Sequence, residues 1–115
     1  MRAFVCLFAI LWVQSFCAWA DASTEIQHLL SFIGSSGCTF VRNGEEYDAA
    51  AARSHIERKY EYAKRWIRTA EQFIEHTAAE SSISGEPYGV ICSGREERSS
   101  DWLKRELERF RTLSN

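Results

Sequence analysis

The longest regular pattern in the chain places apolar residues at steps of four and three between Asp48 and Glu80. This spacing forms one face of an α-helix. The apolar positions are Ala52, Ile56, Tyr60, Ala63, Ile67, Ala70, Ile74 and Ala78. The opposite face is charged, with Arg53, Glu57, Glu61, Lys64, Arg65, Arg68, Glu71 and Glu75. The pattern predicts a central amphipathic helix that supplies one wall of a small core.

A single straight helix over this stretch would be about 45 Å long at 1.5 Å per residue, longer than a small domain is wide. Thr69-Ala70-Glu71-Gln72 has the spacing of a capping box, in which a threonine begins a helix and a glutamine three residues later supports it. The sequence therefore leaves two alternatives open. Either the helix breaks and restarts near Arg68–Thr69, or Thr69 lies inside a continuous helix.

Two shorter amphipathic segments flank the central one. The first is expected to begin at Ser23 or Thr24 and to end between Gly34 and Gly37, with Ile26, Leu29, Leu30 and Ile33 on its apolar side. The last is expected to be capped by Ser99 or Ser100, with Trp102, Leu103, Leu107 and Phe110 on its apolar side. Both patterns predict amphipathic helices.

Two turn signals predict β-hairpins. Asn43-Gly44 and Ser93-Gly94 each supply the positive φ angles of a two-residue hairpin turn. The strands expected around them are Cys38–Arg42, Glu45–Tyr47, Tyr88–Cys92 and Arg95–Arg98, with Asp48 capping the central helix. Because a lone hairpin is only marginally stable, we expect one four-stranded antiparallel sheet. The predicted fold class is α+β, with the sheet packed by three to four helices. One of these helices is long, and whether it is kinked stays open.

The hairpin-to-helix order occurs twice, around Asn43-Gly44 and again around Ser93-Gly94. This echo is weak, because any two hairpins that lead into helices look alike at this length. The repeat of order is therefore noted without a prediction of internal duplication.

The first twenty residues have the pattern of a secretory signal. Arg2 precedes an apolar run from Ala3 to Val13, and Ala18-Trp19-Ala20 provides small residues for cleavage after Ala20. The run is shorter than the roughly 20 residues that a membrane-spanning helix needs, so an uncleaved anchor is the less favoured alternative. We expect a signal peptide at 1–20 and one domain at 21–115, without a membrane span after cleavage.

Two cysteines remain outside the signal, Cys38 and Cys92. In an oxidising compartment a pair of cysteines most simply forms one disulfide, and the absence of CxxC spacing argues against a metal pair or a redox motif. The long loop between them corresponds to a stabilisation of roughly 4 kcal/mol in the chain-entropy model. The sequence thus predicts a Cys38–Cys92 bridge that draws the two hairpins together.

Three stretches in order, Phe40–Gly44, Thr69–Ile74 and Ser81–Tyr88, resemble the YfeK-like family of small exported bacterial proteins. The likeness covers most of the chain after the signal. It implies a periplasmic location in a Gram-negative bacterium. It implies no activity and no catalytic residue, because the family's function is not established.

Composition and spacing argue against several function classes. The net charge of −2 does not favour nucleic-acid binding. His55 and His76 are too far apart along a helix to share a metal ion, and no HxxxH or Cys/His cluster occurs. We therefore predict no metal and no cofactor. Catalysis would have to use a loop serine with His55 or His76, and no GxSxG element supports it.

The leading hypothesis is a non-enzymatic periplasmic protein that binds an unknown protein or envelope component. Its candidate surface combines the serine-rich loop at 81–88 with the first hairpin, on the assumption that the disulfide brings them together. The candidate residues are Arg42, Asn43, Tyr47, Lys59, Ser82, Ser84 and Tyr88. Two alternatives remain: an inhibitor or immunity-type protein that occupies another enzyme's cleft, and an envelope hydrolase that uses a loop serine.

Overall fold

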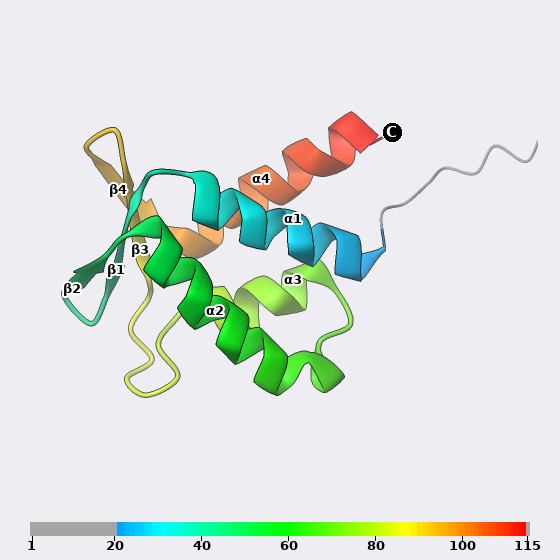
Figure 1. The fold of residues 1–115 in the computed structure, drawn as a ribbon, viewed down its shortest axis with the longest axis horizontal. Coiled ribbons are helices and arrows are strands. Elements are labelled where there is room, and N and C mark those ends of the chain that lie inside the picture. The colour runs from blue at the N-terminus through cyan, green and yellow to red at the C-terminus, as the bar shows by residue number, and fades with distance from the viewer. Residues whose placement is uncertain (1–20, 115) are drawn as a thin grey trace, which may run out of the picture.

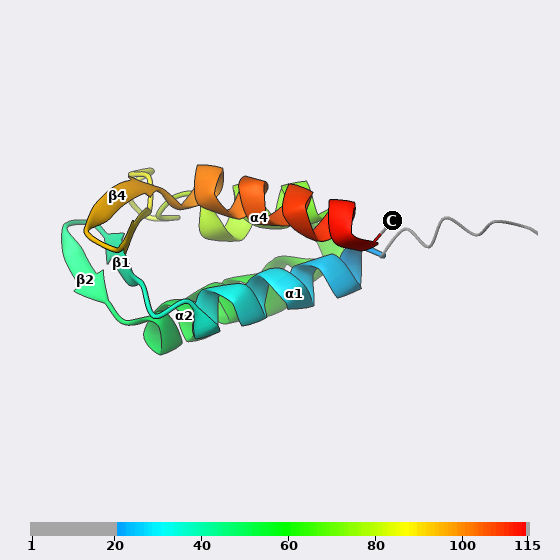
Figure 2. The same ribbon diagram turned by 90° about the horizontal axis from the view of Figure 1, so that it is seen from above.

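The computed structural model describes residues 21–114, so the predicted signal peptide at 1–20 lies outside the described residues. Four helical segments form two layers, and a small sheet closes one end of them (Figures 1 and 2). One layer holds α1 and α2, and the other holds α3 and α4. The elements in order are α1 Ala22–Ser35, β1 Thr39–Arg42, β2 Glu45–Tyr47, α2 Ala49–Ala63, η1 Lys64–Trp66, α3 Ala70–Phe73, η2 Ile74–Ala78, β3 Gly89–Cys92, β4 Arg95–Arg98 and α4 Ser99–Ser114. The predicted α+β class is confirmed.

The sheet is antiparallel throughout, with strand order β2-β1-β3-β4. Both hairpin turns have the predicted positive φ angles, 50° and 78° at Asn43 and Gly44 and 52° and 77° at Ser93 and Gly94. The central pair is β1 with β3, in which Phe40 lies opposite Val90. Both of these side chains are buried. The predicted four-stranded sheet made of two hairpins is therefore confirmed.

The helix caps agree only in part with the sequence predictions. Asp48 caps α2 as expected, because its carboxylate accepts a hydrogen bond of 2.8 Å from the Ala51 backbone amide. The prediction for α1 is wrong: Asp21 is the cap, and it accepts from Thr24 N at 2.8 Å. The predicted cap at Ser99 or Ser100 is also wrong, because both residues lie inside α4. Strand β4 runs directly into α4, and the Ser99 hydroxyl donates instead to the Ala78 carbonyl at 2.5 Å.

The central helical stretch breaks where the capping box lies. Helix α2 continues into the short 3₁₀ turn η1, and Ile67 is then extended, with φ −100° and ψ 113°. Thr69 begins α3, and its hydroxyl accepts from Gln72 N at 3.1 Å. The Gln72 side chain accepts in return from Arg68 N at 2.7 Å. Of the two alternatives, the fresh start near Arg68–Thr69 is confirmed.

The core lies between the two helical layers and reaches the inner face of the sheet. Its fully buried residues come from every layer and include Leu29, Leu30, Phe73, Ile74, Val90 and Leu103. At the sheet, Phe40 meets Trp102 of α4 edge to face, with ring centroids 5.6 Å apart. At the other end, the Arg111 guanidinium pairs with the buried Glu25 carboxylate at 2.6 Å and also with Glu71. This cluster joins α1, α3 and α4 where no sheet holds them together.

None of the helices within residues 21–114 combines the length and the apolar character that crossing a lipid bilayer requires.

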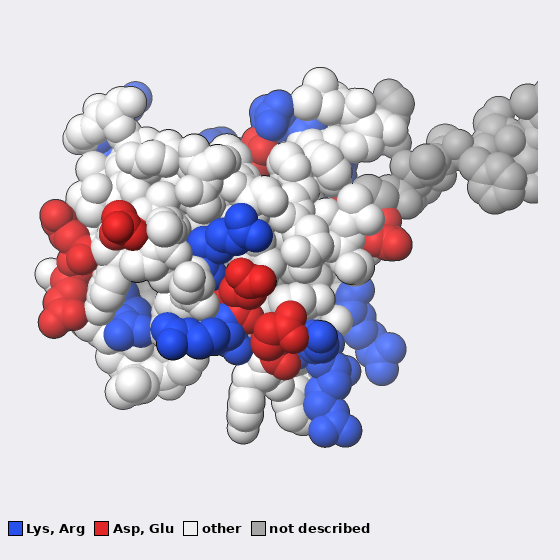
Figure 3. Space-filling model, in the orientation of Figure 1, with Lys and Arg blue, Asp and Glu red and all other residues white. Residues whose placement is uncertain are grey.

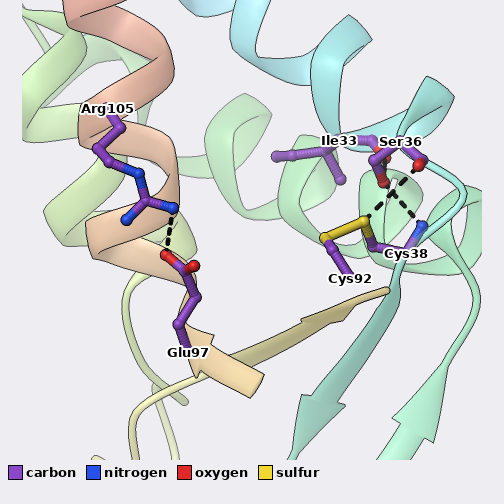
Figure 4. The surroundings of a disulfide bond; sticks show 6 residues. All are labelled: Ile33, Ser36, Cys38, Cys92, Glu97 and Arg105. Carbon is purple, nitrogen blue, oxygen red and sulfur yellow. Dashed lines mark hydrogen bonds and ion pairs between the residues drawn. A yellow bond between two sulfur atoms is a disulfide. The ribbon is translucent and has the colours of Figure 1, made fainter. Parts of the chain in front are cut away.

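The predicted disulfide is present and joins the ends of the two central strands (Figure 4). The Cα atoms of Cys38 and Cys92 are 4.8 Å apart, and the bridge closes a sequence separation of 54 residues. It lies next to the Thr39–Ile91 pair, the outermost pair of the β1–β3 register. The bridge therefore fixes which residue of β1 faces which residue of β3.

Replacing both cysteines with serine tests this contribution. We expect the Cys38→Ser, Cys92→Ser double variant to lose about 4 kcal/mol of unfolding free energy, because its unfolded chain gains the freedom of a 54-residue loop. Urea unfolding followed by circular dichroism would measure the change. Reductant should lower the midpoint of the wild-type protein toward that of the variant and leave the variant unchanged. Equal midpoints for the oxidised protein and the variant would contradict the assignment.

Candidate functional site

A cavity of about 340 Å³ lies between the first hairpin and α2. Phe40, Val41, Ala51, Ala52 and Ile56 form its apolar part. Its polar part comes from Arg42, Tyr47, Ser54, His55, Arg58, Tyr88 and Ser99. The volume is within the usual range for small-molecule sites, near its lower end.

Strand register and helix spacing bring three of these polar side chains together with Lys59, which lies at the edge of the cavity. Arg42 is two residues after Phe40 and so shares the inner face of β1. Continuing the β1–β3 register by one step past Val41–Gly89 places Tyr88 across from Arg42. His55 and Lys59 are one turn apart on α2 and so lie on the same side of the helix. We refer to Arg42, His55, Lys59 and Tyr88 as the Arg42 cluster.

Hydrogen bonds within the Arg42 cluster converge on His55 and on the Tyr88 hydroxyl. Arg42 Nη1 lies 3.0 Å from His55 Nε2, and the Tyr88 hydroxyl lies 3.1 Å from the same nitrogen. Lys59 Nζ donates to the Tyr88 oxygen at 3.1 Å and to the Glu80 carbonyl at 3.0 Å. Because Arg42 can only donate, Nε2 accepts from it only when the imidazole is neutral. The arrangement therefore favours a neutral His55.

The electrostatics of the cluster point the same way. Burial lowers the pKa of His55, and the nearby charges of Arg42, Lys59 and Arg58 lower it further. Burial also lowers the pKa of Lys59, with a second contribution from Arg42 and an opposing one from Glu80. The pKa of Tyr88 is raised, mainly by burial, so its hydroxyl keeps its proton. Positive charge is thus concentrated here, and at Lys59 it is opposed in part by the charge of Glu80.

The cluster has more hydrogen-bond donors than acceptors. Within residues 21–114, Arg42 makes no ion pair, and its Nε is buried without a hydrogen-bond partner. Arg42 Nη2 donates to the Tyr47 hydroxyl at 3.4 Å, and that hydroxyl in turn donates to Glu45 at 2.8 Å. Tyr47 therefore lies between Arg42 and this acidic side chain. A buried donor without a partner costs free energy, which an incoming acceptor would recover.

A second hollow of about 480 Å³ lies beside the Asn43-Gly44 turn. Its lining includes Glu86, Glu96 and Glu97. Because it lacks the convergent donors of the smaller cavity and contains several carboxylates, we take the cavity at the Arg42 cluster as the candidate site.

The serine-rich loop is fastened to the hairpin turn by Asn43. The Ser84 hydroxyl donates to the Asn43 side-chain oxygen at 2.5 Å, and the Asn43 side-chain nitrogen donates to the Ser81 hydroxyl at 3.3 Å. Ser81 is buried and also accepts from backbone amides of its own loop. These bonds give Asn43 and Ser84 a structural task, that of holding the loop against the first hairpin.

The geometry offers no support for a serine–histidine pair. The hydrogen-bond partners of the His55 ring are Arg42 and Tyr88, and the loop hydroxyls of Ser81 and Ser84 bond with Asn43. Within the described part of the chain, His55 makes no hydrogen bond to a loop serine. Among those residues there is also no group of three His, Cys, Asp or Glu side chains placed to hold a metal ion.

Comparison with known proteins identifies the family. The family model for DUF5329, a family of unknown function, matches residues 20–111. The chain belongs to the DUF5329 family. One relative is a Salmonella typhimurium protein described as the uncharacterized protein YfeK, which is 36% identical over 93 residues, covering 76% of this chain and 77% of the relative. The resemblance found in the sequence is thereby confirmed. No solved structure matches the chain.

In this DUF5329 protein, four of the seven candidate residues meet at the cavity or its edge. Arg42, Lys59 and Tyr88 belong to the Arg42 cluster, and Tyr47 lines the same cavity. Asn43 and Ser84 lie at the loop contact instead. Ser82 is exposed, and nothing in the described part of the chain ties its hydroxyl to the cluster.

The sequence-based candidate surface lacks His55, Ser54 and Arg58, which also line the cavity. The sequence alone gives His55 only the role of a base for a loop serine. One signal is available: His55 is four residues before Lys59, so the two share a helix face. A sequence argument that selects Lys59 as a candidate binding residue therefore also favours His55.

The lowered pKa of His55 predicts a loss of stability in mild acid. An unfolded histidine binds a proton near pH 6.5, whereas the folded protein resists protonation of His55 to a lower pH. Unfolding free energy should therefore fall between pH 7.5 and 5.5, and it should fall less in His55→Gln. Urea unfolding at several pH values would measure this, with the exposed His76→Gln as the matched control. An equal pH dependence in wild type and His55→Gln would contradict the assignment.

Proposed function

We propose that this protein is a non-enzymatic binding protein of the bacterial envelope that takes up a ligand with an anionic group in the cavity at the Arg42 cluster. The observation that carries the proposal is the buried excess of donors: Arg42 has an unpaired Nε and no carboxylate partner within residues 21–114, and Lys59 and His55 lie beside it. A carboxylate or phosphate supplies the acceptors that this arrangement lacks.

The shape of the cavity suggests the character of the rest of the ligand. Phe40, Ala51, Ala52 and Ile56 provide an apolar lining next to the charged side chains. A ligand with one oxyanion and a short apolar body satisfies both parts. The proposed ligand class is therefore a small amphipathic anion, either free or as the end of a larger envelope component.

An exported, periplasmic location is part of the proposal. It is supported by the disulfide, which forms and persists in oxidising compartments, and by the signal-like pattern of residues 1–20. In that setting, phosphate and carboxylate groups of envelope components are available ligands.

Hexyl phosphate and hexanol are matched probes for this site, because they differ only in the charged group. We expect isothermal titration to show saturable one-to-one binding of hexyl phosphate and much weaker binding of hexanol. Arg42→Gln should weaken the binding of hexyl phosphate about ten- to hundredfold, because a charge-assisted hydrogen bond contributes about 1.5–3 kcal/mol.

Arg95→Gln is the control, since it removes an exposed arginine of β4 that is outside the cavity lining. Binding of hexyl sulfate, whose single charge does not change over this range, should tighten as the pH falls from 7.5 to 6, because an anion beside His55 favours the protonated imidazole. The proposal fails if hexyl phosphate does not bind, or if Arg42→Gln and Arg95→Gln bind it equally well.

A further inference from the structure

Two large aromatic side chains project from the end of α2 and the turn after it. Tyr62 is 85% exposed and Trp66, one helical turn later, is 63% exposed. The inner side of this stretch is occupied by other residues, Tyr60, Ala63 and Ile67, which pack against the core. Most of the surface of Tyr62 and Trp66 is therefore free of contact with the described fold.

The exposed side of α2 forms a continuous stripe. Ser54, Arg58 and Tyr62 follow at steps of four, and Trp66 continues the series into η1. Ser54 and Arg58 also line the cavity, so the stripe runs from the cavity to the end of the helix. We refer to residues 58–68, which contain its aromatic end, as the α2 corner.

The α2 corner is positively charged although the chain as a whole has a net charge of −2. It contains Arg58, Lys59, Lys64, Arg65 and Arg68 against one acidic residue, Glu61. Figure 3 shows Lys and Arg side chains gathered where Figure 1 places the end of α2. Glu61 pairs with Lys64 at 2.9 Å, whereas Arg58, Arg65 and Arg68 make no ion pair within residues 21–114.

The break in the helix makes the corner protrude. After η1, the extended Ile67 turns the chain toward α3 and is itself buried, which anchors the corner from inside. The Arg65 guanidinium lies over the Trp66 ring, 5.1 Å from its centroid. Trp66 can therefore contact a surface without disturbing the core.

We infer that the α2 corner docks the protein on an anionic lipid surface. Tryptophan and tyrosine prefer the headgroup region of a bilayer, where the ring is partly apolar and its polar group stays hydrated. Arginine and lysine nearby are attracted to lipid phosphates, and each raises the affinity about fivefold. The α2 corner combines both features on one protruding edge. Docking there brings the cavity's rim close to the lipid headgroups, and it does not depend on the cavity being occupied.

Vesicle binding tests the inference directly. Protein recovered after export, with its N-terminus checked by mass spectrometry, would be mixed with vesicles of phosphatidylcholine containing 30% phosphatidylglycerol and with vesicles of phosphatidylcholine alone. We expect co-sedimentation with the anionic vesicles only, weakening as salt rises from 0.05 to 0.5 M. Brominated lipids should quench the fluorescence of Trp66 and spare the buried Trp102.

Two double variants separate the aromatic and the charged contributions. Tyr62→Ser, Trp66→Ser should abolish sedimentation, and Arg65→Gln, Arg68→Gln should weaken it about 30-fold, as two lost basic residues imply. The matched controls are Ile83→Ser, which removes an apolar side chain exposed elsewhere, and Arg95→Gln, Lys104→Gln, which removes two exposed charges elsewhere. Both should bind like wild type, and thermal unfolding would verify that every variant is folded.

The inference is overturned if the wild-type protein does not bind anionic vesicles or binds both vesicle types equally. It is also overturned if Ile83→Ser abolishes binding and the variants of the α2 corner do not. Arg42→Gln separates this inference from the proposed function, because it should leave vesicle binding unchanged while weakening hexyl phosphate.

Discussion

The pairing of β1 with β3 is the constraint on which the remaining structure depends. These strands come from two hairpins that are far apart in the sequence, and neither hairpin is stable alone. The Cys38–Cys92 bridge lies at one end of the pair and the Arg42 cluster at the other. A register slip by one residue would turn Tyr88 to the outer face of the sheet and separate it from Arg42. The covalent bond therefore determines the geometry of a site it does not touch.

The helix break has a comparable influence on the second half of the fold. A continuous helix would carry its apolar face out of the core, whereas the restart at Thr69 folds α3 back into the layer opposite α1 and α2. The return brings Glu80 near Lys59, whose ammonium group bonds the Glu80 carbonyl. It also leads the loop at 81–88 to Asn43, where Ser81 and Ser84 attach it. The break in the helix thus allows the loop to place Tyr88 at the cavity, and it leaves Trp66 exposed outside the core.

Most of the fold could be predicted because its signals are local. The dipeptides Asn43-Gly44 and Ser93-Gly94 specify their turns through backbone conformation alone, and the capping box at Thr69 specifies a helix start. The prediction of a cap at Ser99 is wrong because its hydroxyl bonds a distant carbonyl, Ala78, which no local pattern reveals. The site was only partly predictable for the same reason. The rotation of α2 about its own axis decides that His55 faces Arg42, and that rotation is set by tertiary packing.

The order of elements on either side of the β1–β3 pair is the same: a helical segment, a hairpin and a helix. A two-fold axis between Phe40 and Val90 would exchange each residue of β1 with the one fifty positions later in β3, and the two strands share the same pattern of burial. Under that exchange, Cys38 and Cys92 take the places of Tyr88 and Arg42. One geometrical location therefore occurs twice in the molecule and is used in two ways, once as a permanent crosslink and once as an open polar recess. The two locations correspond in the backbone, whereas their side chains differ completely in chemistry.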